Sequence, residues 1–314
     1  MAVVVRGLNL GGLWLLPAAM LGAQPALAAK KADAPKAAVQ AYQPKPGLWL
    51  LADEDTKIYL FGTTHMLAPG FQWRSAAVDK AAAEADELVI ETIDDPEAEI
   101  DAASLELVLL EKPVPVLDRV PAQHRKAVAK AFKRSDVRPQ DLALMRTWMV
   151  AIMLGFAQEM KGWGVDDLKD APGVEDSLEK QFREAGKPIL AVETPQAGLE
   201  AFSALSEAEQ VNLLLEAAIP AQGDDAEAED GTESDDLWAQ GRYEEAYERD
   251  MAEFPPALFE GLVVKRNAAW TEWLKARLEK PGTVLFAVGA AHLAGPQSVQ
   301  KMLTERGLEA KRVD

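Results

Sequence analysis

The sequence predicts an α/β (α+β) fold, with a mixed β-sheet core formed by N- and C-terminal βαβ segments and a large helical middle region. Two similar apolar runs near the ends of the chain, 58–61 and 283–288, have the length and composition of buried strands. Most of the intervening chain has helical composition. Each apolar run is followed by a glycine and then by a histidine three residues later, at the carboxyl end of the strand, where ligands bind in open α/β sheets.

The first 28 residues have the pattern of a secretory signal peptide. They contain one basic residue, Arg6, an apolar stretch over 8–22 and a small-x-small sequence at 26–28. An uncleaved membrane anchor is the alternative, but the stretch is interrupted and short for a bilayer span. We therefore expect cleavage after Ala28, secretion across the inner membrane into the periplasm, and no membrane span in the mature chain.

The N-terminal part of the mature chain predicts a lead-in, a hairpin and a βαβ unit. Residues 29–45 are rich in Ala, Lys and Pro and predict a flexible lead-in. A single domain then covers 46–314. Its first two apolar runs are joined by a polar turn, which predicts a hairpin. A helix over 73–85 and a strand over 88–90 complete the unit.

The rest of the chain is mainly helical until the second apolar run. An acidic stretch over 223–236, with no basic residue, predicts a solvated loop, and calcium binding there lacks the EF-hand spacing. A short apolar run at 188–192 predicts a buried strand. The other expected helices and the last strand are 122–132, 142–160, 174–185, 195–219 with a break near 206, 237–278 with a break at 255–256, 296–306, and the strand 308–313.

Charge and cysteine content restrict the partners. The net charge is -18 and the chain has no cysteine. An acidic surface of this kind opposes binding to nucleic acid or anionic lipid. Without cysteine there is neither a disulfide nor a site for lipoprotein modification. The pattern leaves the oligomeric state open.

Two histidines occur in the same local setting. Gly-x-x-His is found at 62–65 and again at 289–292, and only three histidines are present in the chain. Glu91 and Glu193 also follow apolar runs directly. If these strands share a sheet edge, His65, His292 and Glu91 form a ligand set for a divalent metal such as zinc, manganese or cobalt. Glu193 could accept a proton from water, so the pattern predicts metal-assisted hydrolysis.

Each of these residues also has a structural interpretation. A single histidine after a strand more often caps a loop by hydrogen bonds, and it is the repetition that favours a site here. The two glutamates could cap helices. His124 lies in a segment with the composition of a polar helix, which indicates a surface position. The tryptophans are more typical of core packing than of a sugar-binding platform. Arg266, beside Asn267, is either a surface charge or an anion clamp.

The order of motifs along the chain carries a family resemblance. From about Gly47 to the C-terminus, the chain contains GLWLLADEDTKIYLFGTTHML, ELVIET, GKPILAVETPQ, KRNAAW and LFAVGAAHLAGPQSVQKMLTERGL. In these motifs the chain resembles the TraB/GumN family, which is related to the TIKI metalloproteases that act on Wnt proteins. The family's paired GxxH motifs fall on His65 and His292, and its first acidic position falls on Glu91. Glu193 corresponds to a second acidic position, and Arg266 with Asn267 to an Arg-Asn pair.

The resemblance implies an α/β core with a divalent-metal site and a peptidase or other hydrolase activity on a peptide or small-molecule substrate. His65, Glu91 and His292 are then the metal ligands, and Glu193 is a further ligand or general base. Arg266 and Asn267 would steady an oxyanion or a substrate carboxylate. The acidic stretch is an addition to the common pattern.

A non-catalytic role is the competing hypothesis. The family is also distantly similar to ChaN-like haem-binding proteins and to erythromycin esterases. The chain could therefore be a cell-envelope binding protein for haem, a metal or a peptide, with His65 or His292 as an axial haem ligand. Both hypotheses require the two histidines to lie close together.

Overall fold

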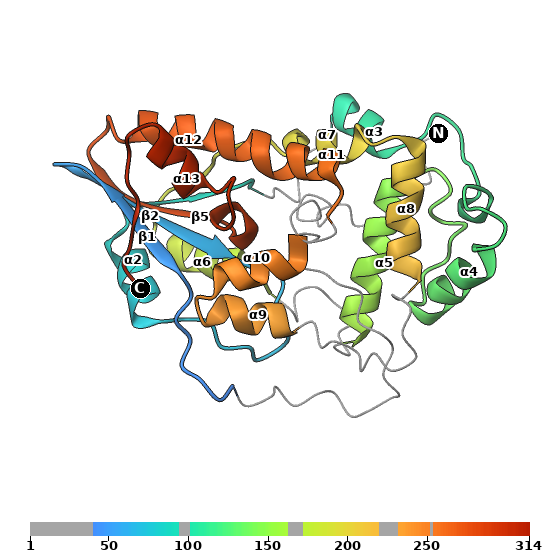
Figure 1. The fold of residues 1–314 in the computed structure, drawn as a ribbon, viewed down its shortest axis with the longest axis horizontal. Coiled ribbons are helices and arrows are strands. Elements are labelled where there is room, and N and C mark those ends of the chain that lie inside the picture. The colour runs from blue at the N-terminus through green and yellow to red at the C-terminus, as the bar shows by residue number, and fades with distance from the viewer. Residues whose placement is uncertain (1–39, 94–100, 163–171, 220–231, 252–253) are drawn as a thin grey trace.

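The computed structural model describes residues 40–93, 101–162, 172–219, 232–251 and 254–314. The predicted signal peptide, residues 29–39 of the predicted lead-in and residues 223–231 of the predicted acidic loop lie outside these ranges. Figure 1 shows a sheet with its covering helices beside a region built of helices alone. Helix α12, Lys265–Arg277, runs from the sheet toward the helical region and links the two.

The described strands form one six-stranded sheet in the order β4-β3-β5-β2-β1-β6. In chain order they are β1 Leu48–Ala52, β2 Thr56–Thr63, β3 Glu87–Ile90, β4 Ile189–Ala191, β5 Gly282–Gly289 and β6 Lys311–Arg312. Strand β1 pairs antiparallel with β2 and β6, whereas the β2–β5, β5–β3 and β3–β4 pairs are parallel. The predicted mixed sheet is confirmed, and so is the predicted hairpin of β1 and β2.

The two ends of the chain share the centre of this sheet. Strand β5 lies between β2 and β3, so the N-terminal unit β2-α2-β3 closes around a strand from the C-terminal unit. Helix α13 then carries the chain past β2 and β1 to β6. β2 and β5 are buried along nearly their whole length because both faces of the sheet are covered.

The middle of the chain is helical, as predicted. No helix in the described part of the chain has both the length and the apolar character of a membrane span. The helices are α2 Ala76–Glu84, α3 Ala102–Val108, α4 Arg125–Arg134, α5 Thr147–Gly162, α6 Val174–Glu184, α7 Gln196–Ser203, α8 Glu207–Ala218, α9 Thr232–Ala239, α10 Tyr243–Met251, α11 Pro256–Phe259, a π-helical segment Glu260–Val264, α12 Lys265–Arg277, α13 Val299–Glu305, and 3-10 turns Val116–Asp118 and Ala290–Leu293.

Two hydrophobic cores correspond to the two regions. One core is made by the sheet with α2, α6, α9, α10, α13 and the second half of α12. The other is made by α4, α5, α7, α8 and α11 with the π-helical segment. Apolar contacts of this kind supply most of the stability of a helix that is only moderately amphipathic.

The structure differs from the predictions in several places. The last strand spans only 311–312, and the predicted helix 237–278 has a further break at 240–242. Residues 40–45 of the predicted flexible lead-in are held in place: Gln40 bonds to the backbone of Gln72, and the Tyr42 hydroxyl donates to Asp236. Residues 232–236 of the predicted acidic loop begin α9, whose acidic first turn complements the helix dipole. β4 is an edge strand, and its Leu190 is 42 % exposed, so the apolar run at 188–192 is not buried on both faces.

Candidate functional site

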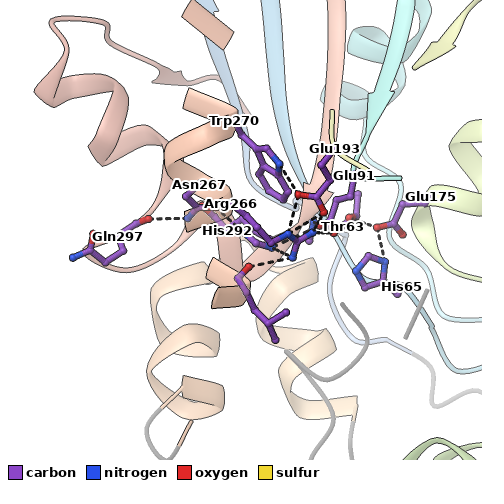
Figure 2. A network of polar contacts seen from close by, with 12 residues as sticks. Thr63, His65, Glu91, Glu175, Glu193, Arg266, Asn267, Trp270, His292 and Gln297 are labelled. Atoms are coloured by element: carbon purple, nitrogen blue, oxygen red, sulfur yellow. Dashed lines mark hydrogen bonds and ion pairs between the residues drawn. The ribbon is translucent and has the colours of Figure 1, made fainter. Parts of the chain in front are cut away.

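The two Gly-x-x-His motifs lie side by side at one sheet edge. β2 and β5 are parallel neighbours, with Thr63 opposite Gly289 at their carboxyl ends. His65 follows in the loop after β2, and His292 follows in the 3-10 turn Ala290–Leu293. Glu91 comes directly after β3, the next strand on the other side of β5. Figure 2 shows the side chains of this edge together.

Gly289 is the point around which the three predicted metal ligands gather. A Cβ atom on this residue would lie 3.2 Å from Glu91 Oε1, 3.5 Å from His65 Nε2 and 3.6 Å from His292 Cδ2. Its backbone N–H donates to Glu91 Oε1 at 2.7 Å. A glycine at this position therefore leaves the space into which these side chains point.

His292 is fully buried and oriented by Asn267. The amide of Asn267 donates to the carbonyls of His292 and Gln297, which leaves its Oδ1 facing His292 Nδ1 at 2.6 Å. Nδ1 therefore carries the proton and Nε2 the lone pair. Nε2 lies 3.3 Å from an Arg266 nitrogen and 3.8 Å from Glu91 Oε1. Burial and the Arg266 charge lower the pKa of His292 to about 3, so the ring is neutral.

His65 faces the same space from the other side. Its side chain is 8 % exposed, and Nδ1 lies 2.9 Å from Glu175 Oε1. Both ring nitrogens are buried without a hydrogen bond of normal geometry among the described residues: Nδ1 has only the close contact with Glu175, and Nε2 has no partner. Burial lowers the pKa of His65, but the charge of Glu175 outweighs this and raises the pKa to about 9.

Arg266 joins the two glutamates. One terminal nitrogen donates to Glu91 Oε2 at 2.5 Å, while Nε and the same terminal nitrogen donate to Glu193 at 2.9 and 2.5 Å. The other terminal nitrogen donates to the carbonyl of Leu262, in the π-helical segment, at 3.1 Å. Trp270 donates its indole N–H to the second oxygen of Glu193 at 2.9 Å. Arg266 is thus a buried clamp rather than a surface charge.

The two carboxylates of this network have pKa values shifted in opposite directions. Burial raises the pKa of Glu91, but Arg266 and the two histidines lower it more, to about 2. Burial dominates at Glu193 and raises its pKa despite the bonds from Arg266. Burial disfavours the charged form of Arg266, yet both glutamates together raise its pKa. Glu91 and Arg266 are therefore an ion pair, with Glu193 the more basic carboxylate beside them.

All six residues predicted from the sequence lie in this region, but they differ in what they contact. Glu91, Glu193, Arg266 and His292 form one contact network, whereas His65 is adjacent and bonded elsewhere. The side chain of Asn267 is occupied in orienting His292. His124 lies at the N-terminal end of α4, outside the network in Figure 2.

Two residues of the site were not predicted. Glu175 stands in the first turn of α6, where a glutamate usually signals only a favourable helix terminus. Trp270 was assigned to the core, and it is buried there, but its indole N–H bonds Glu193 and its ring lies 4.4 Å from that of His292. No spacing in the sequence distinguishes these two roles from ordinary packing.

A ready-made metal cluster is absent from the described residues: no three His, Asp or Glu side chains stand close enough to hold an ion as they are. The donor chemistry nevertheless fits. Both imidazoles have Nδ1 against a side-chain oxygen and Nε2 directed at the space beside Glu91, the usual arrangement of metal-binding histidines. The positively charged guanidinium of Arg266 lies next to this space and would compete with a metal ion for it.

The comparisons with known proteins identify the family. The family model described as the TraB/PrgY/gumN family matches residues 47–312. Neither the curated proteins nor the solved structures contain a match to the chain. The family match spans both Gly-x-x-His motifs, the strands β2 and β5 that position them, and the Arg266 helix. The chain belongs to the TraB/PrgY/gumN family.

Proposed function

We propose that the protein is a metal-dependent hydrolase with a peptide-like substrate. The observation that carries the proposal is the matched orientation of His65 and His292, whose Nε2 atoms face one space beside an ionised Glu91. These three side chains would hold a divalent cation such as zinc, manganese or cobalt. A cation held there would supply Lewis-acid chemistry, which polarises a carbonyl group and acidifies water.

The remaining residues have separate tasks around that space. Glu193 has a raised pKa and suits the role of a base that takes a proton from water, since it is the more basic of the two carboxylates. Arg266 supplies a fixed positive charge for a developing oxyanion or a substrate carboxylate. Asn267 and Trp270 act as positioning residues, because they bond His292 and Glu193 respectively.

His65 and Arg266 determine how readily a cation enters. Glu175 stabilises the positive charge of His65, so the ring has to lose its Nε2 proton before Nε2 can donate a lone pair. The Arg266 guanidinium stands 3.3 Å from His292 Nε2 and has to turn toward Glu193 to share the site. We therefore expect cation binding to release protons.

The test is elemental analysis of the purified protein after reconstitution with zinc, manganese or cobalt in separate samples. We expect about one bound metal per chain in the wild type and in His124→Ala, the matched control that removes the third histidine. His65→Ala and His292→Ala should each lose the metal while keeping the circular dichroism spectrum of the wild type. Unchanged stoichiometry in both variants would show that the ion binds elsewhere.

Hydrolysis is tested with the same proteins. Metal-loaded wild type and His124→Ala should cleave members of a fluorogenic peptide library, and the two site variants should not. A protein that binds metal but cleaves neither peptides nor esters would fit the alternative of a binding protein. A Soret band on mixing with haemin, lost in the histidine variants, would favour haem as that ligand.

We also propose that the protein is exported and periplasmic. The support is the signal-peptide pattern of residues 1–28. N-terminal sequencing of the protein recovered from a periplasmic fraction should begin at Ala29. Recovery of an intact Met1 from the cytoplasm would contradict export.

A further inference from the structure

We propose that Glu175 is a positioning residue that holds His65 with Nε2 directed at Glu91 and His292. The proposal deepens the proposed function, on which its consequence for cation binding rests. The orientation itself is a property of the metal-free protein, and it can be measured there. Figure 2 shows the Glu175 carboxylate next to the His65 ring, with a dashed line between the two side chains.

The N-terminus of α6 is pressed against the loop that carries His65. The Val174 N–H donates to the Thr64 carbonyl at 3.0 Å. A Cβ atom on Gly173 would lie 2.6 Å from the carbonyl carbon of His65, closer than real Cβ contacts allow. Glu175, one residue further, is 7 % exposed. The backbone just before Glu175 is therefore fixed against the loop that carries His65, and the Glu175 side chain starts from a defined position.

One oxygen of Glu175 serves two partners. Oε1 accepts the Thr63 hydroxyl hydrogen and lies 2.9 Å from His65 Nδ1, while Oε2 is buried without a partner among the described residues. A buried carboxylate with one oxygen unsatisfied is costly, so its position is unexplained by packing alone. The attraction between this carboxylate and the imidazole fixes the ring and leaves Nε2 on its far side.

His65 and His292 are thus held in the same way by different partners. His292 Nδ1 faces the neutral amide oxygen of Asn267, whereas His65 Nδ1 faces the carboxylate of Glu175. A carboxylate behind an imidazole increases its basicity as a metal ligand, which an amide does to a smaller extent. His65 is therefore the stronger donor of the pair.

The test compares Glu175→Ala, Glu175→Gln and the control Glu184→Gln, which changes an exposed glutamate on the same helix. In the metal-free protein, NMR with labelled histidine should show a His65 Nδ1 proton protected from exchange, assigned by its absence in His65→Ala. We expect Glu175→Ala to lose this signal and Glu175→Gln to keep it, because an amide oxygen at the same place can still accept from Nδ1–H. Zinc affinity should fall about 10–100-fold in Glu175→Ala, less in Glu175→Gln, and stay unchanged in the control.

The outcomes separate this proposal from the hydrolase proposal. A wild type that binds no zinc overturns the metal site, but the Nδ1 signal still tests Glu175. A wild type that binds zinc, together with a Glu175→Ala variant that keeps the Nδ1 signal and the affinity, overturns the positioning role. If Glu175→Ala does not fold, Glu175→Asp decides, because its shorter side chain cannot reach Nδ1: wild-type behaviour would overturn the proposal, and loss of signal and affinity would support it.

Discussion

At the scale of single residues, Arg266 is the most constrained side chain of the site. It is 6 % exposed and bonds two carboxylates and a backbone carbonyl. Burying a guanidinium is favourable only when its donors are paired, and removing it leaves Glu91 and Glu193 as uncompensated neighbours. The sequence left Arg266 open between a surface charge and a clamp, since nothing in KRNAAW indicates burial.

Arg266→Ala should lower the free energy of unfolding by about 3–5 kcal/mol, because it strands a buried carboxylate. Arg277→Ala is the matched control on the same helix, since Arg277 pairs with Glu87 in a less buried setting and should cost about 1 kcal/mol or less. Urea unfolding followed by circular dichroism measures both variants. Equal losses would contradict the assignment of Arg266 as the clamp of the network.

Gly289→Ala tests the space between the predicted ligands. The added methyl group would stand 3.2 Å from Glu91 Oε1 and 3.5 Å from His65 Nε2, so zinc affinity should fall by about tenfold or more while the fold persists. In Gly155→Ala the new methyl meets no atom within 4 Å, and this change in α5 should stabilise the protein by about 0.5–1 kcal/mol. Isothermal titration and thermal unfolding distinguish the two, and unchanged affinity in Gly289→Ala would place the cation elsewhere.

At the scale of elements, the sequence predicts well where the strands lie along the chain, but it predicts poorly which strands pair with each other in the sheet. β2 and β5 contain apolar runs of clear strand type, and the glycine near the carboxyl end of each strand marks the approach to the site. That β5 inserts between β2 and β3 depends on pairing between distant segments, which no local pattern encodes. β4 was expected to be buried because its run is apolar, but its place at the sheet edge leaves Leu190 exposed.

The last strand shows how a short element is stabilised by one side chain. β6 spans two residues, and just beyond it Asp314 accepts hydrogen bonds from the Leu48 N–H at 3.2 Å and from Arg312 Nε at 2.6 Å. Burial raises the pKa of Asp314, but these two donors together hold the pKa below its ordinary value of 3.8. The folded protein therefore binds fewer protons at this group than the unfolded chain does.

Asp314→Asn should cost about 1 kcal/mol of unfolding free energy at pH 7, and the difference from wild type should shrink as the pH falls below about 4. The sign follows from the lowered pKa: the stabilisation is present above the unfolded pKa and is lost as the folded carboxylate becomes protonated. Glu309→Gln, an exposed change beside the same strand, should show neither effect. Urea titrations at several pH values provide the measurement, and a constant difference across pH would contradict the role of the charge.

At the scale of the whole molecule, the site lies where the two cores meet. The continuous helix formed by α11, the π-helical segment and α12 places Leu262 in the helical core and Trp270 in the sheet core, with Arg266 between them. The π-helical segment sits immediately before Arg266 and supplies one of its acceptors. Such segments are frequent at functional sites because they redirect side chains within a helix.

The two cores should respond separately to mutation. Leu154→Ala in α5 and Leu285→Ala in β5 each remove a fully buried side chain and should each cost about 2–5 kcal/mol. Hydrogen exchange should rise mainly in α5 and α8 for the first variant and mainly in the sheet for the second. A uniform rise in both variants would show that the two regions open as one unit.

The candidate site was predictable as a set of residues but not as a network. Repetition of Gly-x-x-His and the glutamates after strand runs nominated the residues at one edge, and the parallel pairing of β2 with β5 explains why they meet. The bond from Arg266 to both glutamates and the support of His65 by Glu175 join segments far apart in sequence. Such partners depend on how α6 and α12 pack on the sheet.

The most direct test of the metal site is an anomalous difference map from crystals grown with zinc, recorded at the zinc absorption edge. We expect one strong peak about 2.0–2.1 Å from His65 Nε2 and His292 Nε2, with a Glu91 oxygen beside it and Arg266 turned toward Glu193. The peak should be absent from crystals of His292→Ala grown in the same way. No peak beside Gly289 in the wild type, or a peak only among acidic surface residues, would contradict a metal centre at this edge of the sheet.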